Sequence, residues 1–406
     1  MKHLGDITKI HNADPVWIVT GGSPCQDLSV AGKRAGLKHS DKGDDETTRS
    51  GLFMEQIRVT KEMRENDRRN GRTDEFIRPR FFVWENVPGA LSSGSPSGED
   101  FRIVLEEVAR IAQPDADVPR PAEPWTNAGC IVGSGWSIAW RISDNQFWGT
   151  PQRRKRIALV ADFAGESAPE ILFERSCMQG NPSKIDGQGE ETPGNSADGL
   201  KKPGKTIAYR KQGHPQNQEE GQGWEEARVS DTLNVFDNSE NRTPILVIEN
   251  HPMDSRVRIS DDNVFQTLHS RMGTGGGNVP MVVENMIVRR LTPLECERLQ
   301  GFPDYWTYIG DWTDSKGKTH KDSDAVKYRA IGNSIGLPFW EWMAKRMVGI
   351  LTKSGVSDPT LGSLFDGIGG FPLAFSRAGC KPIWASEIEE FPIAVTRYHF
   401  PEGENE

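Results

Sequence analysis

The hydrophobic positions of this chain form short apolar runs and amphipathic stretches, with turns rich in glycine and proline between them. Short runs of β-branched and aromatic residues predict buried strands, and apolar residues three or four positions apart predict helices. The predicted strands are 16–20, 81–84, 136–142, 157–161, 361–365 and 382–386, and the predicted helices are 52–65, 100–112, 293–300, 338–353 and 371–378. Residues 1–22 are expected to hold two short strands joined by a turn, and residues 113–135 to form a loop. Thr292 and Glu295 predict a capping box at the start of a helix.

The pattern changes between residues 163 and 285, where glycine and polar residues increase and helical periodicity disappears. Residues 231–247 resemble residues 266–283 at an offset of 35 or 36 positions, which predicts two similar β-turn-β units. The cations around Tyr209 form a candidate phosphate-contacting strip, namely Lys201, Lys202, Lys205, Arg210 and Lys211. For residues 176–200 a poorly ordered linker is the alternative interpretation.

Length and composition narrow the classes of protein to which this chain can belong. With 406 residues it can form two or three domains, and no apolar run approaches the length of a membrane span. The first residues do not resemble a signal peptide, so we expect the protein to stay in the compartment where it is made. Because the net charge is −9, any binding of nucleic acid must use local basic patches.

The five cysteines are scattered, and the chain contains neither a CxxC nor an HExxH motif, so we predict no metal site. An odd, scattered set of cysteines suits a reducing cytosol. Cys25 stands apart, because it follows two glycines, a serine and a proline at the end of the strand 16–20. Open α/β sheets place their chemistry at such strand ends. A buried cysteine is often an inert hydrophobe, but a glycine-rich loop lies at the surface, so we predict that Cys25 is a nucleophile.

Polar residues also follow or precede other predicted strands. Glu85 ends the strand 81–84, and it is either a surface carboxylate or a functional one. The four cations Arg153 to Arg156 run directly into the strand 157–161, so some of them should face an anionic or polar group near the sheet edge. Residues 33–50 are expected to form a mobile, functional loop beside Cys25.

A glycine turn near the end of the chain predicts a nucleoside-binding site. Residues 366–370 follow a predicted strand, and Glu387 ends the next strand 20 positions after Gly367. This spacing matches a Rossmann-type half in which the acid binds ribose hydroxyls. Pro372 stands where the third glycine of a dinucleotide motif would be, so S-adenosylmethionine fits better than NAD.

A doubly wound sheet needs strands on both sides of the strand 361–365, yet only one predicted strand follows it. The remaining strands must therefore come from the N-terminal part, so both chain ends fold into one sheet and the chain is interpreted as circularly permuted. The alternative is a truncated second domain that starts near residue 358.

Together these segments resemble the DNA (cytosine-5) methyltransferases with a permuted motif order, over nearly all of the chain except about 163–285. The matching segments are 365–370, Glu387, 5–7, 24–26, 85–87, 152–156, 290–303 and 332–334. In the family the Phe-x-Gly-x-Gly-Gly loop opens the chain, whereas here it closes it. The resemblance implies a Rossmann-like, S-adenosylmethionine-dependent methyltransferase fold with a smaller, mostly β or irregular target-recognition domain.

The resemblance also implies a reaction at a cytosine that has been flipped out of duplex DNA. Cys25 would add to C6 of the base, which makes C5 nucleophilic toward the sulfonium methyl group. Glu85 would protonate or hydrogen-bond N3, and Arg156 would hold O2 with Arg154 beside it. The implied catalytic residues are thus Cys25, Glu85, Arg154 and Arg156.

The implied binding residues fall into two sets. S-adenosyl-L-methionine, the only cofactor expected, would be bound by Phe365, Gly367, Ile368, Gly369, Gly370, Glu387, Asp6, Ile7 and Asn333. Double-stranded DNA would be bound by Pro24, Gln26, Ser29, Asn86, Gln152, Lys201, Lys202 and Arg271.

The expected organisation is a catalytic part at 1–162, a target-recognition domain at 163–285 and a return to the catalytic domain at 286–406. We expect a cytoplasmic, prokaryotic or phage-encoded monomer without membrane contact. A cognate restriction endonuclease that acts separately is left open. The alternatives are a tRNA cytosine-5 methyltransferase, a catalytically inactive DNA-binding relative and a dehydrogenase-like protein that binds NAD.

Overall fold

The computed structural model describes residues 1–23, 51–173, 208–211, 224–227, 246–251, 256–259, 264–273, 279–284 and 287–402. Its largest unit is an eight-stranded sheet with the strand order β1-β16-β15-β2-β3-β6-β5-β4. The strands are β1 (Lys2–His3), β2 (Ile18–Gly21), β3 (Phe81–Asn86), β4 (Ala128–Gly133), β5 (Trp136–Asp144), β6 (Lys155–Asp162), β15 (Thr360–Leu364) and β16 (Lys381–Ser386).

The two ends of the chain form one sheet, as the sequence predicted. Strand β15 pairs in parallel with β16 on one side and with β2 on the other, and β1 and β3 continue the parallel part. Strands β6, β5 and β4 then complete the sheet in antiparallel order. The predicted α/β fold with a permuted chain order is therefore confirmed, and the alternative of a separate truncated domain is not supported.

Helices cover both faces of this sheet because its central strands are apolar on both sides. In β3 the buried side chains of Phe82 and Trp84 join the core under α1 (Gly51–Arg69) and α2 (Glu99–Ala112). Phe81 and Val83 point to the opposite core, as expected for alternating side chains of a strand. That core is covered by α3 (Ala168–Leu172), α6 (Leu337–Lys353) and α7 (Gly370–Arg377).

The helix α4 (Pro293–Leu299) begins with the predicted capping box, in which Thr292 and Glu295 bond reciprocally. Three helices were not predicted: α3, α5 (Asp324–Asn333) and α8 (Glu390–His399). The five residues of α3 are too few to show a helical period, and α5 and α8 carry few fully buried apolar residues, so neither gives a clear apolar stripe in the sequence. Short elements complete this part: η1 (Ile7–Lys9), η2 (Asp74–Phe76), η3 (Pro88–Ser92), η4 (Asn145–Phe147), η7 (Ser270–Gly273), β13 (Trp312–Thr313) and β14 (Thr319–His320).

The prediction of a loop over residues 113–135 was wrong in part, because β4 lies within it and pairs with β5. Its glycines conceal the strand pattern, yet the packing requires them. A Cβ on Gly129 would lie 2.3 Å from the Trp140 ring, and one on Gly133 would lie 2.1 Å from the Trp136 ring. The large rings of β5 thus cover the glycines of the edge strand.

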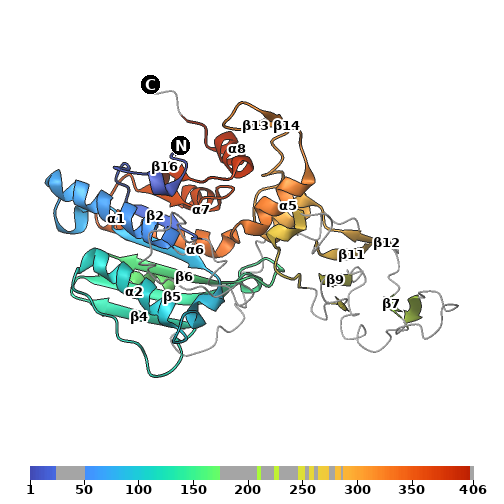
Figure 1. The fold of residues 1–406 in the computed structure, drawn as a ribbon, viewed down its shortest axis with the longest axis horizontal. Coiled ribbons are helices and arrows are strands. Elements are labelled where there is room, and N and C mark those ends of the chain that lie inside the picture. Colours follow the sequence, from blue (N-terminus) through green and yellow to red (C-terminus); the bar gives the residue numbers. More distant parts are fainter. Residues whose placement is uncertain are drawn as a thin grey trace.

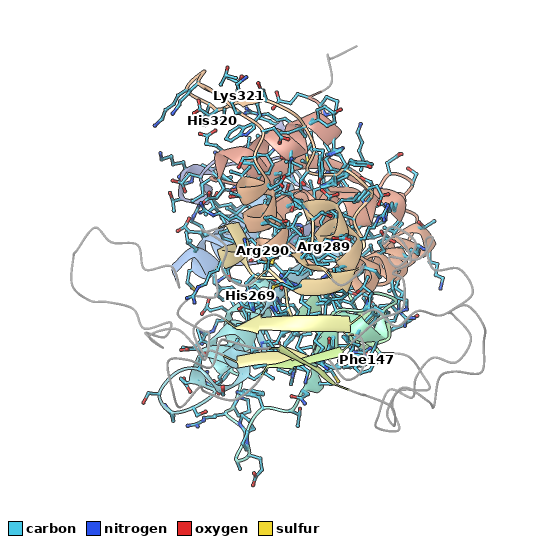
Figure 2. The ribbon with its side chains drawn as sticks, turned by 90° about the vertical axis from the view of Figure 1, so that its right-hand side faces the viewer. Phe147, His269, Arg289, Arg290, His320 and Lys321 are labelled. Atoms are coloured by element: carbon cyan, nitrogen blue, oxygen red, sulfur yellow. The ribbon has the colours of Figure 1, made fainter. Side chains whose placement is uncertain are left out.

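A second, four-stranded sheet has the order β10-β9-β11-β12. It lies beyond α5, on the right of Figure 1, and Figure 2 looks onto that side. The strands are β9 (Leu246–His251), β10 (Arg256–Ile259), β11 (Met281–Glu284) and β12 (Ile287–Arg290). The two repeated segments meet here, because Val282 of β11 pairs with Val247 of β9. The predicted domain border at residue 285 falls between β11 and β12.

Elsewhere in the predicted recognition region, β7 (Ala208–Lys211) and β8 (Trp224–Ala227) form a separate antiparallel pair. The predicted linker at 176–200 and the lysines Lys201, Lys202 and Lys205 lie outside the described residues.

The first residues of the chain are bound to its last described residues (Figure 1). The amino group of Met1 donates to the carbonyl oxygens of Phe400 and Pro401, at 3.2 and 2.9 Å. His3 Nε2 and Thr396 Oγ1 of α8 lie 2.8 Å apart. A short connection between these segments would therefore not disturb the sheet.

We predict that a rearranged chain folds if residues 1–2 are joined to residue 402 by a short linker and the chain is opened at 354–359, between α6 and β15. The new ends lie between elements, so no strand pairing is lost. The melting temperature, measured by circular dichroism, should change by less than about 4 °C. A control chain opened between Val83 and Trp84 in β3 should not unfold cooperatively, and equal behaviour of the two chains would contradict the prediction.

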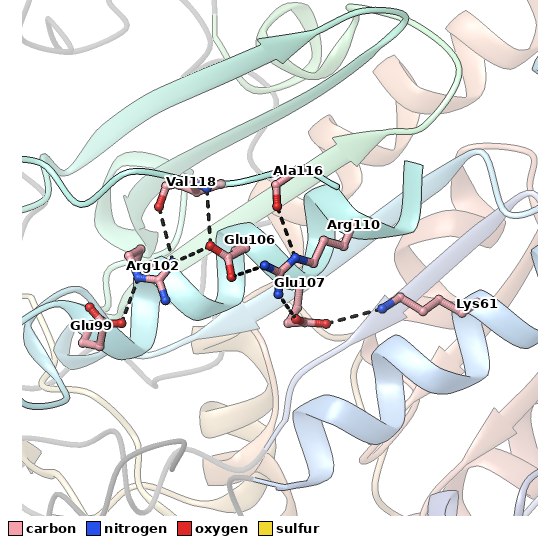
Figure 3. Close-up of polar contacts among 8 residues, drawn as sticks. All are labelled: Lys61, Glu99, Arg102, Glu106, Glu107, Arg110, Ala116 and Val118. Carbon is pink, nitrogen blue, oxygen red and sulfur yellow. Dashed lines mark hydrogen bonds and ion pairs between the residues drawn. The ribbon is translucent and has the colours of Figure 1, made fainter. Parts of the chain in front are cut away.

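A network of charged side chains connects α2 to α1 and to the segment that follows α2 (Figure 3). Glu106 accepts from Arg110 Nη2 at 2.7 Å and from Arg102 Nη1, and its side chain is 9% exposed. Arg110 Nη1 also donates to Glu107 at 2.9 Å, and Lys61 of α1 contacts Glu107 at 3.3 Å. Glu106 is thus the buried centre of the network, and Lys61 is its exposed end.

We predict that Glu106→Gln lowers the free energy of unfolding by about 1–3 kcal/mol, because two arginines lose their shared charged acceptor. Urea denaturation at neutral pH measures this difference. Lys61→Ala is the control, and it should change the stability by less than about 0.5 kcal/mol because its ion pair is exposed. Equal effects of the two variants would show that burial of Glu106 does not matter.

Candidate active site

The carboxyl ends of the parallel strands meet at one edge of the large sheet. Gly22 and Ser23 follow β2, Glu85 lies near the end of β3, and Glu387 follows β16. Strand β6 runs in the opposite sense, so its first residues, including Arg156, start at the same edge. The predicted functional residues therefore come from strands that are far apart in the sequence and adjacent in the sheet.

Glu85 and Arg156 form an ion pair at this edge. Arg156 Nε lies 2.9 Å from Glu85 Oε1, and the two side chains are 20% and 14% exposed, in that order. A Cβ on Gly22 would lie 2.9 Å from Glu85 Oε2, so the Gly22 backbone lies directly against this carboxylate. The arrangement places a carboxylate, oriented by a cation, beside the segment that leads to Cys25. Such a group can bind or transfer a proton of a substrate.

The residues before Cys25 are fixed by polar side chains of β3. Trp84 Nε1 donates to Ser23 Oγ at 3.0 Å, and Asn86 Nδ2 donates to the carbonyl oxygen of Ser23 at 3.3 Å. Asn86 itself is 1% exposed. Cys25 follows Ser23 by two positions. Cys25, Pro24, Gln26, Ser29 and the predicted loop at 33–50 lie outside the described residues.

The other described cysteines are placed away from this edge or are buried. Cys130 is exposed on the edge strand β4. Burial raises the pKa of the Cys296 thiol, and it raises the pKa of Cys380 to about 12. Neither buried thiol can supply much thiolate near neutral pH. Among the described cysteines, none is placed as a nucleophile at this edge.

Arg154 and Gln152 are buried, unlike Arg156. Arg154 is 2% exposed, and its guanidinium donates to the carbonyl oxygens of Leu268 at 3.0 Å, Gly332 at 3.3 Å and Ser334. Gln152 is 0% exposed and accepts from Asn145 Nδ2 at 3.3 Å. The structure thus brings Arg156, and not Arg154, to Glu85. Arg154 thus connects the start of β6 to two backbone segments behind the edge, one with Leu268 and one at the end of α5.

One of these segments, residues 264–273, belongs by sequence to the predicted recognition region. It is joined to the start of β6, because Phe265 N donates to Pro151 O and Arg153 N donates to Phe265 O, both at 2.8 Å. A Cβ on Gly332 would lie 2.3 Å from the backbone of His269, so this segment runs directly against the end of α5. Arg271, a predicted DNA-binding residue, is exposed on it.

The face shown in Figure 2 carries further exposed residues that the sequence did not single out as site residues. Phe147 of η4 is 54% exposed, close to the start of β6. His269 and Arg290 are also exposed on this face. An exposed aromatic ring and cations on one face are a pattern used for binding nucleic acid. The signal in the sequence was weak, because single exposed aromatic residues are common.

The glycine turn and Glu387 form the second part of the site. Gly367 has φ +58°, its N–H donates to Glu387 Oε2 at 2.8 Å, and a Cβ there would have nothing within 4 Å. Glu387 Oε1 accepts the N–H groups of Ile388 and Glu389 at 2.7 and 2.9 Å. Phe365 also has a positive φ, +54°. The turn is therefore open, and its carboxylate is held in place by backbone donors.

Asp6 and Ile7 lie beside this turn, because Ser386 Oγ donates to the carbonyl oxygen of Gly5 at 2.6 Å. Asp6 Oδ1 accepts from Thr8 N at 3.0 Å and from Thr8 Oγ1 at 2.8 Å, and its side chain is 39% exposed. Ile7 is 3% exposed and packs into the core. Asp6 thus presents a carboxylate near the turn, whereas the Ile7 side chain faces inward.

The back of the turn is braced by the segments around α4 and α5. Trp306 Nε1 donates to the carbonyl oxygen of Ile368 at 2.8 Å, and the Ile368 side chain is fully buried. A Cβ on Gly370 would lie 2.7 Å from Ile335. Asn333, at the end of α5, is exposed. Gly369 has φ +81° and begins α7.

The chemistry of this turn fits S-adenosylmethionine better than a dinucleotide. Glu387 offers carboxylate oxygens that can accept hydrogen bonds from ribose hydroxyls. The carboxylate of Glu387, with that of Asp6 on the adjoining segment, suits a cationic sulfonium compound and disfavours a pyrophosphate. Ile388 is 68% exposed next to Glu387, so an apolar surface for a flat ring is available. The sequence did not identify Ile388, because its exposure depends on the fold.

No helix in the described part of the chain is long and apolar enough to cross a membrane. Within the same described ranges, no group of three or more His, Cys, Asp or Glu side chains could hold a metal ion.

Comparison with known proteins gives a family match. The family model of the C-5 cytosine-specific DNA methylases matches residues 1–112 and 131–349. The match ends before β15 and the glycine turn, which agrees with a motif order in which that part has moved to the end of the chain.

Several individual proteins are similar to this chain. A DNA N-6-adenine-methyltransferase of Escherichia phage P1 is 28% identical over 433 residues, which cover 86% of this chain and 55% of that protein. The type II methyltransferase M1.ScrFI of Lactococcus lactis subsp. cremoris is 24% identical, and the match covers 86% of this chain and 67% of that protein. The crystal structure of the S. pombe Dnmt2 methyltransferase has 14% sequence identity to this chain and a TM-score of 0.43. The match covers 85% of this chain and 83% of that one. The chain thus spans about half of the length of the phage P1 relative.

Asp366 is an ionisable group inside the glycine turn. It is 5% exposed, and Ser363 Oγ donates to its Oδ1 at 2.5 Å, while Oδ2 is buried without a hydrogen-bond partner among the described residues. Burial, with a smaller contribution from the charge of Glu387, raises the pKa of Asp366 to about 8. A carboxyl with a raised pKa in the folded state stabilises the fold less as the pH rises toward that value.

We predict that the free energy of unfolding of the wild type falls between about pH 4 and pH 8 through Asp366, since the unfolded carboxyl ionises near pH 3.9. Asp366→Asn removes this contribution, so it should stabilise the protein by at least about 1 kcal/mol more at pH 8 than at pH 5. Urea denaturation at both pH values measures the difference. A constant difference between variant and wild type would show that Asp366 is ionised in the fold.

Proposed function

Because the chain belongs to the C-5 cytosine-specific DNA methylase family, we propose that it transfers a methyl group from S-adenosyl-L-methionine to C5 of cytosine in duplex DNA. The observation that carries the proposal is the Glu85–Arg156 ion pair beside the strand end that leads to Cys25. The glycine turn and Glu387 lie on the same edge, after β15 and β16. One sheet edge thus supports both a base-binding part and a cofactor-binding part.

In the proposed reaction the Cys25 thiolate adds to C6 of the target cytosine, and the electron pair moves to C5. Glu85 supplies or holds a proton at N3, which lowers the cost of the addition. Arg156 keeps Glu85 oriented and reaches O2 of the base. Bound S-adenosylmethionine supplies an electrophilic methyl group. C5 bonds to this methyl carbon, and the C5 proton then passes to water. The electron pair of the C5–H bond re-forms the C5=C6 double bond as the bond between sulfur and C6 breaks, which releases Cys25 as a thiolate.

For the cofactor we propose that Glu387 binds the ribose hydroxyls and Asp6 the adenine amino group. Phe365, Gly367, Gly369 and Gly370 would shape the pocket, with Ile368 and Ile7 supporting it from the core and Asn333 from the end of α5. Ile388 would cover one face of the adenine ring, since its side chain is 68% exposed. Asp366 would remain neutral below about pH 8 beside Glu387.

For the DNA we propose that residues 163–285, with the adjoining β12, recognise the target sequence. The face in Figure 2 would contact the duplex through Phe147, His269 and Arg290, and through Arg271. The target base would be flipped out, and Pro24, Gln26 and Ser29 would line its pocket. Lys201 and Lys202 would bind phosphates. Asn86, Gln152 and Arg154 would act from behind this surface, because they are buried.

The phage P1 relative carries the name of an adenine methyltransferase, so methylation of adenine N6 is a second candidate. The N6 amino nitrogen can attack a methyl group without prior addition of a thiolate. A strand end that leads to Cys25, next to the Glu85–Arg156 pair, would then have no role. The site therefore favours cytosine.

We predict that a methylation-free bacterial host expressing this chain acquires 5-methylcytosine at one short DNA sequence. Base-resolution sequencing of 5-methylcytosine and N6-methyladenine measures this directly. Cys25→Ala should lower the methylation rate by about 10³-fold or more, and Glu85→Gln by roughly 10²–10⁴-fold. Cys130→Ala is a matched control on β4 and should methylate like the wild type.

N6-methyladenine instead of 5-methylcytosine would overturn the proposed base, and methylated tRNA with unmethylated plasmid would overturn the proposed substrate. Full activity of Cys25→Ala would overturn the covalent route. A folded protein that binds S-adenosylmethionine but methylates nothing would favour an inactive DNA-binding relative.

A further inference from the structure

Three consecutive residues at the end of β2, Gly21 to Ser23, are each covered by a side chain from α1 or β3. From these contacts we infer that Gln56 and Trp84 are positioning residues, which fix the start of the nucleophile segment and thereby set the rate at which Cys25 attacks the base. This inference rests on the proposed function, because it concerns the reactivity of Cys25. The two residues touch no substrate and act through Gly21 and Ser23.

Gln56 of α1 bridges the last residue of β2 and the middle of β3. Its side chain is 0% exposed, and Nε2 donates to the carbonyl oxygen of Val83 in β3 at 3.1 Å. A Cβ on Gly21 would lie 2.6 Å from Cδ, Nε2 and Oε1 of Gln56, so the amide group lies directly against the Gly21 backbone. Gly21 precedes Cys25 by four positions and Val83 precedes Glu85 by two. Gln56 therefore contacts both strands just before their proposed catalytic residues.

A glutamine at this buried position lowers the stability of the fold. Its Oε1 is buried and has no hydrogen-bond partner among the described residues. Such an atom loses its hydration without full compensation, and a methionine of similar shape would avoid this loss. Local choices that lower stability are expected mainly at functional sites. The contact with Gly21 gives the amide a function that an apolar side chain of the same size would lack.

Trp84 fixes the next part of the segment. Its indole Nε1 donates to Ser23 Oγ at 3.0 Å, and both side chains are buried. The indole cannot easily move, because Phe53 and Phe101 lie at ring-centroid distances of 5.8 and 6.4 Å. The Ser23 hydroxyl, two positions before Cys25, is thus attached to a rigid group of the core.

Between these two contacts, Gly22 lies against the carboxylate of Glu85. The end of β2 is therefore held by Gln56 at its first residue, by Glu85 at its second and by Trp84 at its third. A misplacement of a reacting group by about 1 Å can lower a rate by roughly 10²-fold. We thus expect a loss of either positioning contact to slow the attack of Cys25 without weakening the binding of cofactor.

The test is a double-mutant cycle with Ser23→Ala, Trp84→Phe and the double variant. The measured quantity is the single-turnover rate of covalent complex formation with DNA that carries 5-fluorocytosine at the target position. Fluorine cannot leave C5 as a cation, so the complex accumulates. Each single variant should slow this rate by about 10–100-fold. The double variant should be no slower than the slower single variant, because both changes remove the same hydrogen bond.

Trp136→Phe is the matched control. Trp136 Nε1 donates to Gln113 Oε1 at 3.1 Å in the same sheet but away from the site edge. This variant should lose stability like Trp84→Phe and keep the wild-type rate of complex formation. KM for DNA and the affinity for S-adenosylmethionine should stay within about twofold of the wild type in all variants, while kcat falls only for Ser23→Ala, Trp84→Phe and their double variant.

A second pair of variants tests Gln56 independently. Gly21 has an ordinary φ, so Gly21→Ala is opposed mainly by the Gln56 side chain. Gly21→Ala should slow complex formation, and Gln56→Ala added to it should restore part of the rate. Gln56→Met should slow complex formation about tenfold while the melting temperature is unchanged or higher.

The outcomes separate this inference from the proposed function. If the wild type forms no covalent complex, the proposed cytosine reaction fails. If the wild type forms it while Ser23→Ala, Trp84→Phe and Gln56→Met form it at the same rate, the positioning role fails and the proposed function stands. Slowing by Trp136→Phe to the same extent would also overturn the positioning role, because the effect would then follow stability alone.

Discussion

The pairing of β15 with both β16 and β2 is the constraint on which the rest of the structure depends. Strand β15, from the C-terminal part of the chain, thereby lies between β16 of the same part and β2 of the N-terminal part. Because these strands are parallel, their carboxyl ends lie at one edge, and each strand delivers its own group there. Only through this pairing does the part with Gly22 and Glu85 share an edge with the turn that carries Glu387. Without it, the segment that leads to Cys25 and the glycine turn would belong to two separate surfaces.

Much of this architecture could be predicted from the sequence, because the buried strands are short apolar runs with glycine or proline after them. The capping box of Thr292 and Glu295 is a local signal, and it is present as predicted. The strand β4 could not be predicted, since its glycines are required only by the rings of Trp136 and Trp140. The helices α5 and α8 were missed because contacts with distant segments, and not an apolar stripe, stabilise them.

Some residues of the candidate site can also be identified from the sequence next to them, whereas others depend on contacts with distant segments. Glu85 and Glu387 could be identified because each ends an apolar run. The pattern of the cationic run does not distinguish Arg154 from Arg156, because they are the same residue type two positions apart, and the resemblance placed both at the base. Arg156 lies within β6 and faces Glu85, whereas Arg154 precedes the strand and bonds to backbone carbonyls of other segments. Only the tertiary structure decides between them, and the same holds for Gln56 and Ile388.

The attachment of residues 264–273 to the large sheet has a consequence for how such an enzyme can acquire a new target sequence. By sequence this segment belongs to the predicted recognition region, but Arg154, Arg153 and the Gly332 backbone connect it to the large sheet and to the end of α5. An exchange of recognition regions between relatives, in evolution or in the laboratory, therefore has a natural splice point before residue 264. Hybrids joined there keep the native junction with the sheet, whereas hybrids joined nearer to residue 285 replace the partners of Arg154 and must rebuild that junction from foreign sequence.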